Sequence, residues 1–261
     1  MTSYQPEPAA AALHDARKRR AEVAPLPAAI APRTEAEGAA AQRALAHRVG
    51  AATPAGFKIG ATAKRMQEYL GLTGPAAGFM AIGNLYHSGA TVKFADFVHP
   101  GVECELAVRL ARDLPPGPCT QEQAAAAVGD LIAAIEIVEN RYGDLKLLGT
   151  PTLIADQVYH GAAVLGDPGT TDWHDLDMAT LRGRFFVDGH LRDEGVGADL
   201  MGHPMNCLAW LAASSVAAAF GGLKAGQVIM LGSVTPPIWL TGPATVTVEF
   251  APLPPVQVRL A

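Results

Sequence analysis

Short runs of apolar and β-branched residues dominate the chain from residue 55 to residue 261. Each run is long enough for one strand, which predicts a body built mainly from β-sheet. Asp188 and Gly189 lie between two such runs in "RGRFFVDGHLR", and this dipeptide favours a tight hairpin turn. The other expected strands are "GFKIG", "TVKF", "VECELAVRL", "LIAAIEIVE", "QVIML", "ATVTVEF" and "VQVRL".

The chain over residues 1–54 is different, because it is rich in alanine and predicts two helices. The prolines of "PLPAAIAPR" separate them, since proline interrupts helical hydrogen bonding. Thr34 and Glu37 have the spacing of a capping box for the second helix. Further helices are expected over "TAKRMQEYLG" and, as one continuous helix, over "HPMNCLAWLAASSVAAAFGG". The sequence therefore predicts an α+β protein, with a small helical N-terminal part over 1–54 and a β-rich body over 55–261.

Composition limits the classes of protein that fit. Hydrophobic residues make up 49% of the chain and charged residues 17%, which is ample for a core. The formal charge of −5, with no basic run longer than "RKRR" at residues 17–20, argues against a nucleic-acid partner. The longest apolar stretch, around "CLAWLAASSVAAAF", is too short and too serine-rich to cross a membrane. The N-terminus lacks a signal-peptide pattern and the cysteines lack metal-type spacing, so we expect a cytoplasmic protein.

Two glutamates stand two positions apart in the expected strand "VECELAVRL". Strand geometry places Glu103 and Glu105 on one face, with their Cβ atoms roughly 6–7 Å apart. Two neighbouring carboxylates repel unless a cation lies between them or water screens them. Strand alternation alone also produces a face exposed to water, so this pair leaves both interpretations open.

A third glutamate favours the cation. Glu136 lies between Ile135 and Ile137, where the next expected strand should be deeply buried, and burying an unpaired carboxylate is costly. Three carboxylates without convergent cysteine or histidine indicate a hard cation, Mg²⁺ or Mn²⁺. Glu139 is close by, but Arg141 follows it, so we interpret Glu139 as an exposed or arginine-paired residue at the strand end.

Several segments between residues 56 and 250 resemble one enzyme family in their order and separation. These segments are "GFKIGATAKRMQEYLG", "VECELAVRLARDL", "AAIEIVENRY", "LIADQVYHGAAVLG", "GVGADLMGHPMNCLAWLA" and "GSVTPPIWLTGPATVTVEF". The resemblance is to the hydratase/decarboxylase branch of the fumarylacetoacetate hydrolase superfamily. That branch includes 2-hydroxypenta-2,4-dienoate hydratase and 4-oxalocrotonate decarboxylase of aromatic catabolism. It implies a mixed β-sheet roll or barrel of the fumarylacetoacetase C-terminal type.

The resemblance also implies a metal site. Glu103, Glu105 and Glu136 would bind Mg²⁺ or Mn²⁺ as metal ligands. The metal would grip the 1-carboxylate and 2-oxo oxygens of a small 2-keto acid and stabilise the enolate formed from it.

The family resemblance also assigns four further residues to substrate binding. Lys58 would neutralise the substrate carboxylate or polarise its oxo group, the alternative being an exposed lysine on a small strand. Gly60 would let the backbone approach closely. Ser233 and Thr235 of "GSVTPP" would bind the substrate carboxylate, the alternative being an ordinary turn.

The chain departs from the family at two places. Where the hydratases carry an aspartate proposed for acid/base chemistry, Pro75 is followed by Ala76. Where they carry a pair of serines, this chain has Tyr159 and His160. His160 would then serve as general acid/base and Tyr159 as a donor to an oxyanion, or else His160 is structural. Asp156 matches an acidic position of the family, with a structural role as open as a catalytic one.

The resulting hypothesis is a metal-dependent lyase. It would be a hydratase or decarboxylase of a 2-hydroxydienoate or 2-oxoenoate in aromatic catabolism. The alternatives are acylpyruvate-type C–C hydrolysis, keto–enol tautomerisation, and a non-catalytic paralogue that partners an active subunit. We expect a homo-oligomer, with a related decarboxylase or hydratase subunit as a further partner.

Overall fold

The strands form two sheets in the computed structural model, which describes residues 4–70, 72–143, 145–169 and 172–261. The first sheet contains β1 (Gly56–Gly60), β2 (Ala76–Met80), β3 (Leu85–His87), β5 (Pro100–Leu110), β6 (Val128–Glu139), β7 (His160–Leu165), β10 (Val228–Ser233) and β11 (Ile238–Trp239). Their hydrogen-bonded order is β2-β1-β10-β5-β6-β7-β3, with β11 paired to β5. β1 runs parallel to β10, and β3 runs parallel to β7, so the sheet is mixed.

The second sheet has the order β4-β13-β12-β8-β9. Its strands are β4 (Ala90–Val92), β8 (Arg182–Val187), β9 (His190–Val196), β12 (Ala244–Glu249) and β13 (Val256–Leu260). The hairpin between β8 and β9 is confirmed, because Asp188 and Gly189 form its turn with φ of 51° and 76°. Positive φ at both residues matches the twist of a two-residue hairpin.

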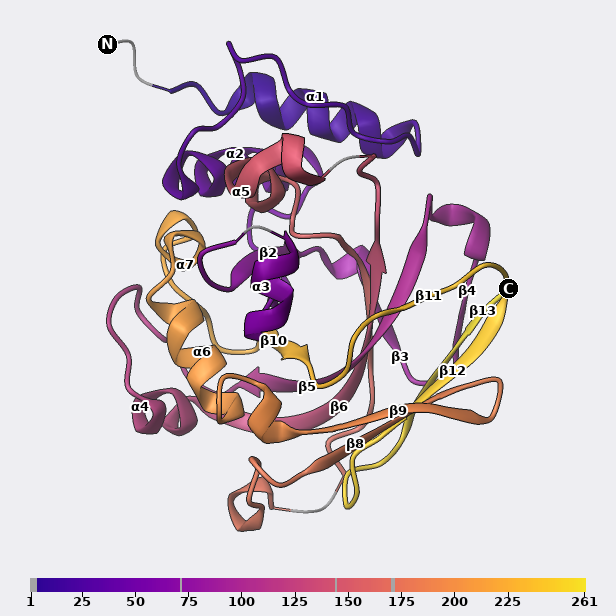
Figure 1. The fold of residues 1–261 in the computed structure, drawn as a ribbon. Helices are drawn as coiled ribbons and strands as arrows, with labels where there is room; N and C mark the ends of the chain where they lie inside the picture. The colour runs from indigo at the N-terminus through magenta and orange to yellow at the C-terminus, as the bar shows by residue number, and fades with distance from the viewer. Residues whose placement is uncertain (1–3, 71, 144, 170–171) are drawn as a thin grey trace.

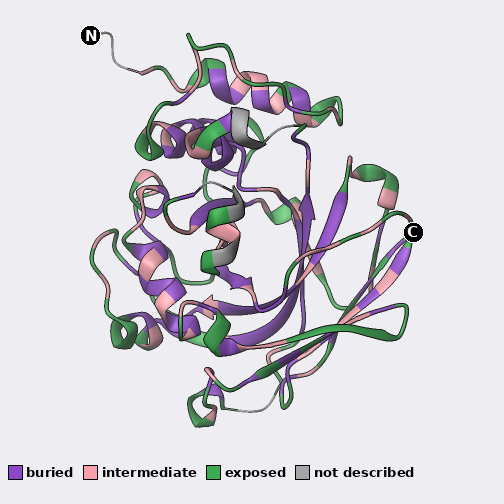
Figure 2. Cartoon of the chain, in the orientation of Figure 1, coloured by how far each residue is buried: buried purple, intermediate pink, exposed green. Residues whose placement is uncertain are grey.

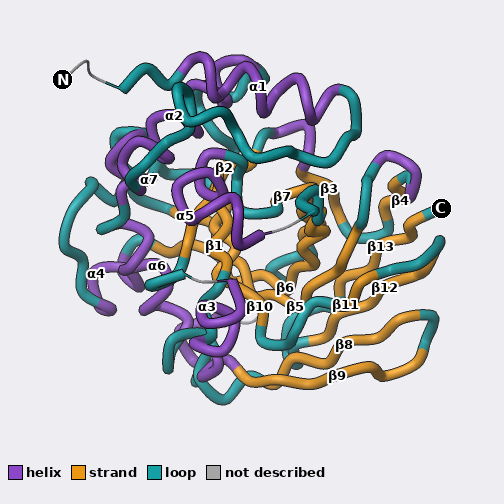
Figure 3. Tube along the Cα trace, turned by 45° about the horizontal axis from the view of Figure 1, so that its top comes forward, coloured by secondary structure: helices purple, strands orange, loops and turns teal. Residues whose placement is uncertain are grey.

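Helices gather mainly beside the first sheet, on the side away from the second sheet (Figures 1 and 3). They are α1 (Glu7–Lys18), α2 (Glu35–Arg48), α3 (Lys64–Leu70), α4 (Gln121–Ala126), α5 (Leu145–Ala155), α6 (Pro204–Ala212) and α7 (Ser215–Ala219). α2 packs against α1, α5 and α7, and α6 packs against β10. The α+β architecture with a curled mixed sheet is therefore confirmed.

Two helix predictions need correction. The helix expected over "HPMNCLAWLAASSVAAAFGG" is broken into α6 and α7, because Ser214 between them caps α7 by accepting a hydrogen bond from the N–H of Ala217. At α2, Thr34 does accept from the N–H of Glu37, as expected. The Glu37 carboxylate, however, accepts from the N–H of Arg33, so the reciprocal half of the capping box does not form.

The central strands β5 and β6 are buried on both faces (Figure 2). Cys104 and Leu106 of β5 face the main core, whereas Ala107 belongs to a second apolar cluster on the opposite face. The face that carries the glutamates is thus covered rather than open to water, which removes the water-exposed interpretation of the acidic pair.

Candidate metal centre and substrate pocket

Three carboxylates converge on the covered face of β5 and β6. Glu103 lies directly opposite Glu136 in the antiparallel register, and Glu105 lies opposite Ser233 of β10. One oxygen from each glutamate lies within 4.8 Å of the others. Glu105 is 1% exposed and Glu136 is 0% exposed, while Glu103 is half-buried. Strand alternation and register together explain why residues so far apart in sequence meet.

The cluster is electrostatically unbalanced. Burial and then the charge of Glu136 raise the pKa of Glu103 to about 7, and burial and the two neighbouring glutamates raise the pKa of Glu105. One oxygen of Glu105 accepts from the N–H of Gly232 at 3.1 Å. The other oxygen is buried and has no hydrogen-bond donor among the described residues. A cation with a preference for oxygen ligands would satisfy these groups.

Within the described part of the chain, Lys58 is the lysine that contacts this cluster. Its Nζ lies 3.2 Å from a carboxylate oxygen of Glu136 and donates to the carbonyl of Val158 at 2.8 Å. The residue is 2% exposed, so it is not the surface lysine of the alternative interpretation. Burial acts against its charge, but Glu136, followed by Glu103 and Glu105, raises the pKa of Lys58 overall. Lys58 therefore stays charged inside the protein.

His160 stands behind the cluster. Its Nδ1 lies 3.0 Å from the second oxygen of Glu136, and the side chain is fully buried. Burial lowers the pKa of His160 despite the opposing effect of Glu136. A neutral ring facing a carboxylate must carry its proton on Nδ1. Burial would raise the pKa of Glu136, but Lys58 and the His160 hydrogen bond hold that pKa below its usual value.

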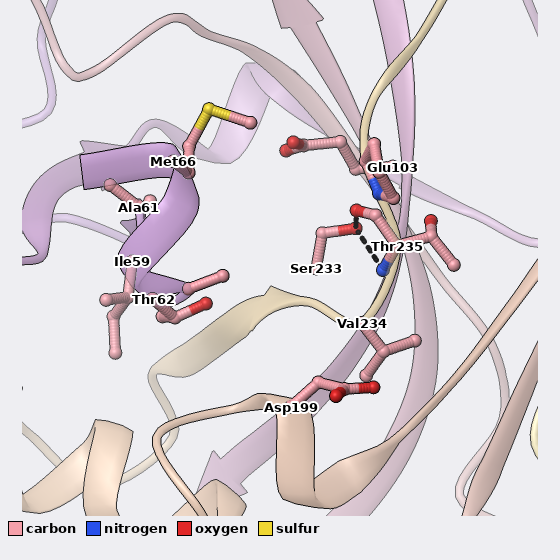
Figure 4. Close-up of a pocket in the computed structure, with 12 residues that line it drawn as sticks. Ile59, Ala61, Thr62, Met66, Glu103, Asp199, Ser233, Val234 and Thr235 are labelled. Carbon is pink, nitrogen blue, oxygen red and sulfur yellow. Dashed lines mark hydrogen bonds between the residues drawn. The ribbon is translucent and has the colours of Figure 1, made fainter. Parts of the chain in front are cut away.

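A pocket of about 300 Å³ opens beside Glu103. Thr62 and Met66 lie on one side of it, and Glu103, Ser233 and Thr235 lie on the other (Figure 4). The described lining residues are Ile59, Gly60, Ala61, Thr62, Ala63, Met66, Glu103, Asp199, Ser233, Val234, Thr235 and Pro236. Glu103 is thus the glutamate through which the buried cluster meets the pocket.

The sequence-predicted substrate residues are divided between the pocket and its surroundings. Gly60, Ser233 and Thr235 line the pocket. The hydroxyl of Thr235 is buried without a hydrogen-bond partner among the described residues, and in Figure 4 it points away from the side of the pocket that carries Met66. The Ser233 hydroxyl donates to the Thr235 carbonyl at 2.7 Å and lies 3.2 Å from the Cys104 carbonyl. Its proton is therefore engaged in a hydrogen bond within the protein.

Lys58, Tyr159 and His160 lie outside this lining. Tyr159 is half-buried, and its ring meets that of Tyr142 edge-on, with 5.1 Å between centroids. Asp156 is fully buried and hydrogen-bonded to Arg17, Arg141 and Tyr142, which is a structural environment.

Some residues at the site were missed by sequence reasoning. Thr62, Met66 and Asp199 line the pocket, although only their segments had been singled out. Arg17 had been interpreted only as part of the basic run "RKRR". Its buried partner Asp156, an isolated acid after an apolar helix, is the signal that an arginine must come from elsewhere in the chain.

The comparisons with known proteins identify the family. The model of the fumarylacetoacetate (FAA) hydrolase C-terminal family matches residues 18–261. The chain belongs to this family. The curated relatives that it matches include hydratases and decarboxylases, as the resemblance predicted. No helix in the described part of this family member is both long enough and apolar enough to cross a membrane.

Three relatives illustrate the likeness. The 2-hydroxyhexa-2,4-dienoate hydratase of Comamonas testosteroni is 36% identical over 184 residues, 69% of this chain and 68% of its own. The 2-keto-4-pentenoate hydratase of Paraburkholderia phymatum is 30% identical over 254 residues, 96% of this chain and 95% of its own. The 4-oxalocrotonate decarboxylase of a Pseudomonas species is 32% identical over 207 residues, 77% of each chain.

The fold also matches solved structures. The 4-oxalocrotonate decarboxylase from Pseudomonas putida G7, complexed with magnesium and adipate, superposes with a TM-score of 0.89 over 100% of this chain and 99% of its own. The two sequences are 24% identical, so this likeness shows the fold. Another solved structure, fumarylpyruvate hydrolase from Pseudomonas aeruginosa in complex with Mn²⁺ and pyruvate, has a TM-score of 0.58 over 78% of this chain and 88% of its own, at 13% identity.

Proposed function

We propose that this protein is a divalent-metal-dependent lyase that acts on a small 2-keto acid of aromatic catabolism. It would add water to a 2-hydroxydienoate or remove carbon dioxide from a 2-oxoenoate, as its relatives are named to do. The observation that carries the proposal is the buried triad of Glu103, Glu105 and Glu136, which meets a pocket of about 300 Å³ through Glu103.

The triad fits a divalent cation. Its donors are hard oxygens, and one oxygen of Glu105 is buried without a hydrogen-bond partner among the described residues. The single charge of Lys58 leaves the ionised cluster with excess negative charge. Proteins of the same fold have been solved with magnesium and with Mn²⁺, so either ion is a candidate. When bound, such a cation supplies Lewis-acid stabilisation to negative charge that develops on the 2-oxo oxygen of the substrate.

The chain's own residues would bind and orient the substrate. Ser233 and Thr235 lie on the pocket wall, where they would meet a substrate carboxylate. Lys58 adds positive charge behind the glutamates and thereby favours an anionic ligand. Gly60 keeps this arrangement open, because a Cβ there would lie 3.2 Å from the Nζ of Lys58 and 3.0 Å from a methyl group of Val158.

We assign His160 a positioning role in this reaction. Its neutral ring donates to Glu136 and lies outside the pocket lining, so it would fix the orientation of one carboxylate. Tyr159 stands where the resemblance places the other serine of the hydratases, and it would have to move to the pocket to act as a donor there. His160 and Glu136 also make the histidine/glutamate pair that C–C hydrolysis would need, but both are 0% exposed, which disfavours water activation by them.

A turnover assay tests the proposal. Metal-free protein is given Mg²⁺ or Mn²⁺ and a panel containing a 2-hydroxydienoate, a dicarboxylic 2-oxoenoate and an acylpyruvate. We expect metal-dependent loss of the first or second compound, with carbon dioxide release separating decarboxylation from hydration. The Glu136→Gln variant should lose this activity, while Asp130→Asn on the same strand should retain it. If the wild type turns over nothing on the panel with either metal, the non-catalytic paralogue replaces the lyase.

A further inference from the structure

The residues after α5 form an unusual turn. Gln157, Val158 and Tyr159 have φ of 62°, 51° and 64°, so three consecutive non-glycine residues adopt the left-handed conformation. This conformation is unfavourable for L-residues and most unfavourable for a β-branched residue such as Val158. Runs of this kind persist only when surrounding contacts hold them, and they concentrate at functional sites.

The left-handed turn and the residue that follows it each contact a side chain of the metal centre. The carbonyl of Val158 accepts the hydrogen bond from Lys58 at 2.8 Å. His160, the residue after the turn, contacts Glu136 at 3.0 Å. The turn is also pressed against β2, where a Cβ on Gly78 would lie 2.4 Å from the Gln157 carbonyl. Any shift of the turn therefore moves both the lysine and the histidine that flank Glu136.

Arg17, in the last turn of the N-terminal helix α1, binds both ends of the left-handed turn. Its Nε lies 2.8 Å from the carboxylate of Asp156, its Nη2 donates to the Asp156 carbonyl at 2.7 Å, and its Nη1 donates to the His160 carbonyl at 3.5 Å. Asp156 is 0% exposed, and Arg141 and Tyr142 bind its other oxygen. A planar guanidinium is suited to such a multiple contact, since its donors have a fixed geometry.

We infer that Arg17 is a positioning residue for the active site. By bridging Asp156 and His160 it holds the left-handed turn, and the turn in turn fixes Lys58 and the ring of His160 against Glu136. The N-terminal helix is then part of the catalytic apparatus, although Arg17 lies just outside the range that matches the family model. This inference rests on the proposed function, because it concerns the lysine and glutamate of that site.

The test uses Arg17→Met in the full chain, with Arg48→Met as the matched control. Arg48 forms an exposed ion pair with Glu7 across the same two N-terminal helices, and this pair does not involve the turn. We would measure Mn²⁺ affinity, oxalate affinity of the Mn²⁺-loaded protein, kcat, KM and the melting temperature. Misplacing a catalytic group by a small distance costs about tenfold to a hundredfold in rate, so Arg17→Met should lose that much in kcat/KM and bind oxalate more weakly. Arg48→Met should match the wild type in both.

The outcomes separate the two claims. If Arg17→Met melts at a lower temperature but binds oxalate and turns over substrate like the wild type, Arg17 is merely structural and the inference fails. If the wild type itself binds neither Mn²⁺ nor oxalate, the proposed function fails instead. Should Arg17→Met not fold, Arg17→Lys carries the test, because one ammonium group cannot replace all three contacts. Reduced oxalate affinity in Arg17→Lys supports the inference, and unchanged affinity overturns it.

Discussion

Glu136 shows how one residue depends on its surroundings for its charge. It lies in the core with 0% exposure, yet Lys58 at 3.2 Å and His160 at 3.0 Å keep it ionised. Glu103 and Glu105 form no such ion pair with any described residue, and their pKa values are raised. The sequence identified the three glutamates because charged residues in apolar strands are rare. Nothing in the sequence indicated that a lysine and a histidine would both contact Glu136, since those contacts depend on the turn before His160.

The buried histidine predicts a pH dependence of stability. The pKa of His160 is lowered from 6.5 in the folded protein, so below pH 6.5 the unfolded chain binds a proton that the folded chain does not. The contribution of His160 to the free energy of unfolding is therefore fully present above pH 6.5. It is lost as the pH falls through the pKa of the folded protein. Each unit of lowering corresponds to about 1.4 kcal/mol.

The measurement is urea unfolding of metal-free wild type and His160→Asn between pH 7.5 and pH 5.5. Asparagine retains a donor for Glu136 but does not titrate. The wild type should lose more stability over this interval than the variant. Glu103, with its pKa raised to about 7, contributes the opposite slope to both proteins, so the difference between them reports His160. Parallel profiles would show that His160 titrates as it does in the unfolded chain.

At the scale of elements, apolar alternation and turn residues were enough to predict the strands that carry the site. β1, β5, β6 and β10 were expected from their apolar patterns, and their pairing puts Lys58, the glutamates and Ser233 together. β7 was not recognised as a strand, because its start at His160 is set by the left-handed turn rather than by a local pattern. The break between α6 and α7 was missed because alanine and serine there are compatible with a continuous helix.

β2 carries Ala76, at the position where the resemblance places an aspartate of the hydratases. Ala76 lies opposite Gly60 in the antiparallel register, so its side chain is on the same face of the sheet as Lys58. An aspartate there would stand beside the pocket that Gly60 lines. Ala76→Asp should therefore raise the rate at which a 2-hydroxydienoate is hydrated by about 10²–10⁴-fold, the usual contribution of a general acid/base group.

The comparison is between Ala76→Asp and Ala76→Asn, which has nearly the same shape but cannot exchange a proton. Loss of the dienol absorbance with formation of the hydrated product is the readout. Because Ala76 is 2% exposed, both variants should also be somewhat less stable than the wild type. Equal hydration rates in the two variants would place the proton transfer elsewhere.

At the scale of the whole molecule, the N-terminal helices are joined to the body by packing and by charge. Leu13 and Leu45 belong to the same apolar cluster as β5 and β6, and Arg17 reaches Asp156 across 139 positions of sequence. The division at residues 54 and 55 was predicted from the change in composition and remains a prediction. Composition cannot reveal such long-range contacts, because they depend on which surfaces the folded sheet presents.

Metal binding should be visible in the stability of the whole molecule. The triad forms only when β5 and β6 pair, so a cation binds the folded chain in preference to the unfolded one. At a hundredfold excess over Kd such binding stabilises by about 2.7 kcal/mol, which for a chain of this size raises Tm by roughly 5–10 °C. We therefore expect Mg²⁺ or Mn²⁺ to raise Tm after treatment with a chelator.

The Glu105→Gln variant separates this effect from general ionic stabilisation. Glutamine retains the size of the side chain and an oxygen for the N–H of Gly232, but it removes a charge from the triad. Without metal, Glu105→Gln should be at least as stable as the wild type, because the raised pKa of Glu105 marks a charge that burial disfavours. With metal, its Tm should scarcely rise, whereas Asp130→Asn should respond like the wild type. An equal rise in all three proteins would mean that the cation binds somewhere other than Glu103, Glu105 and Glu136.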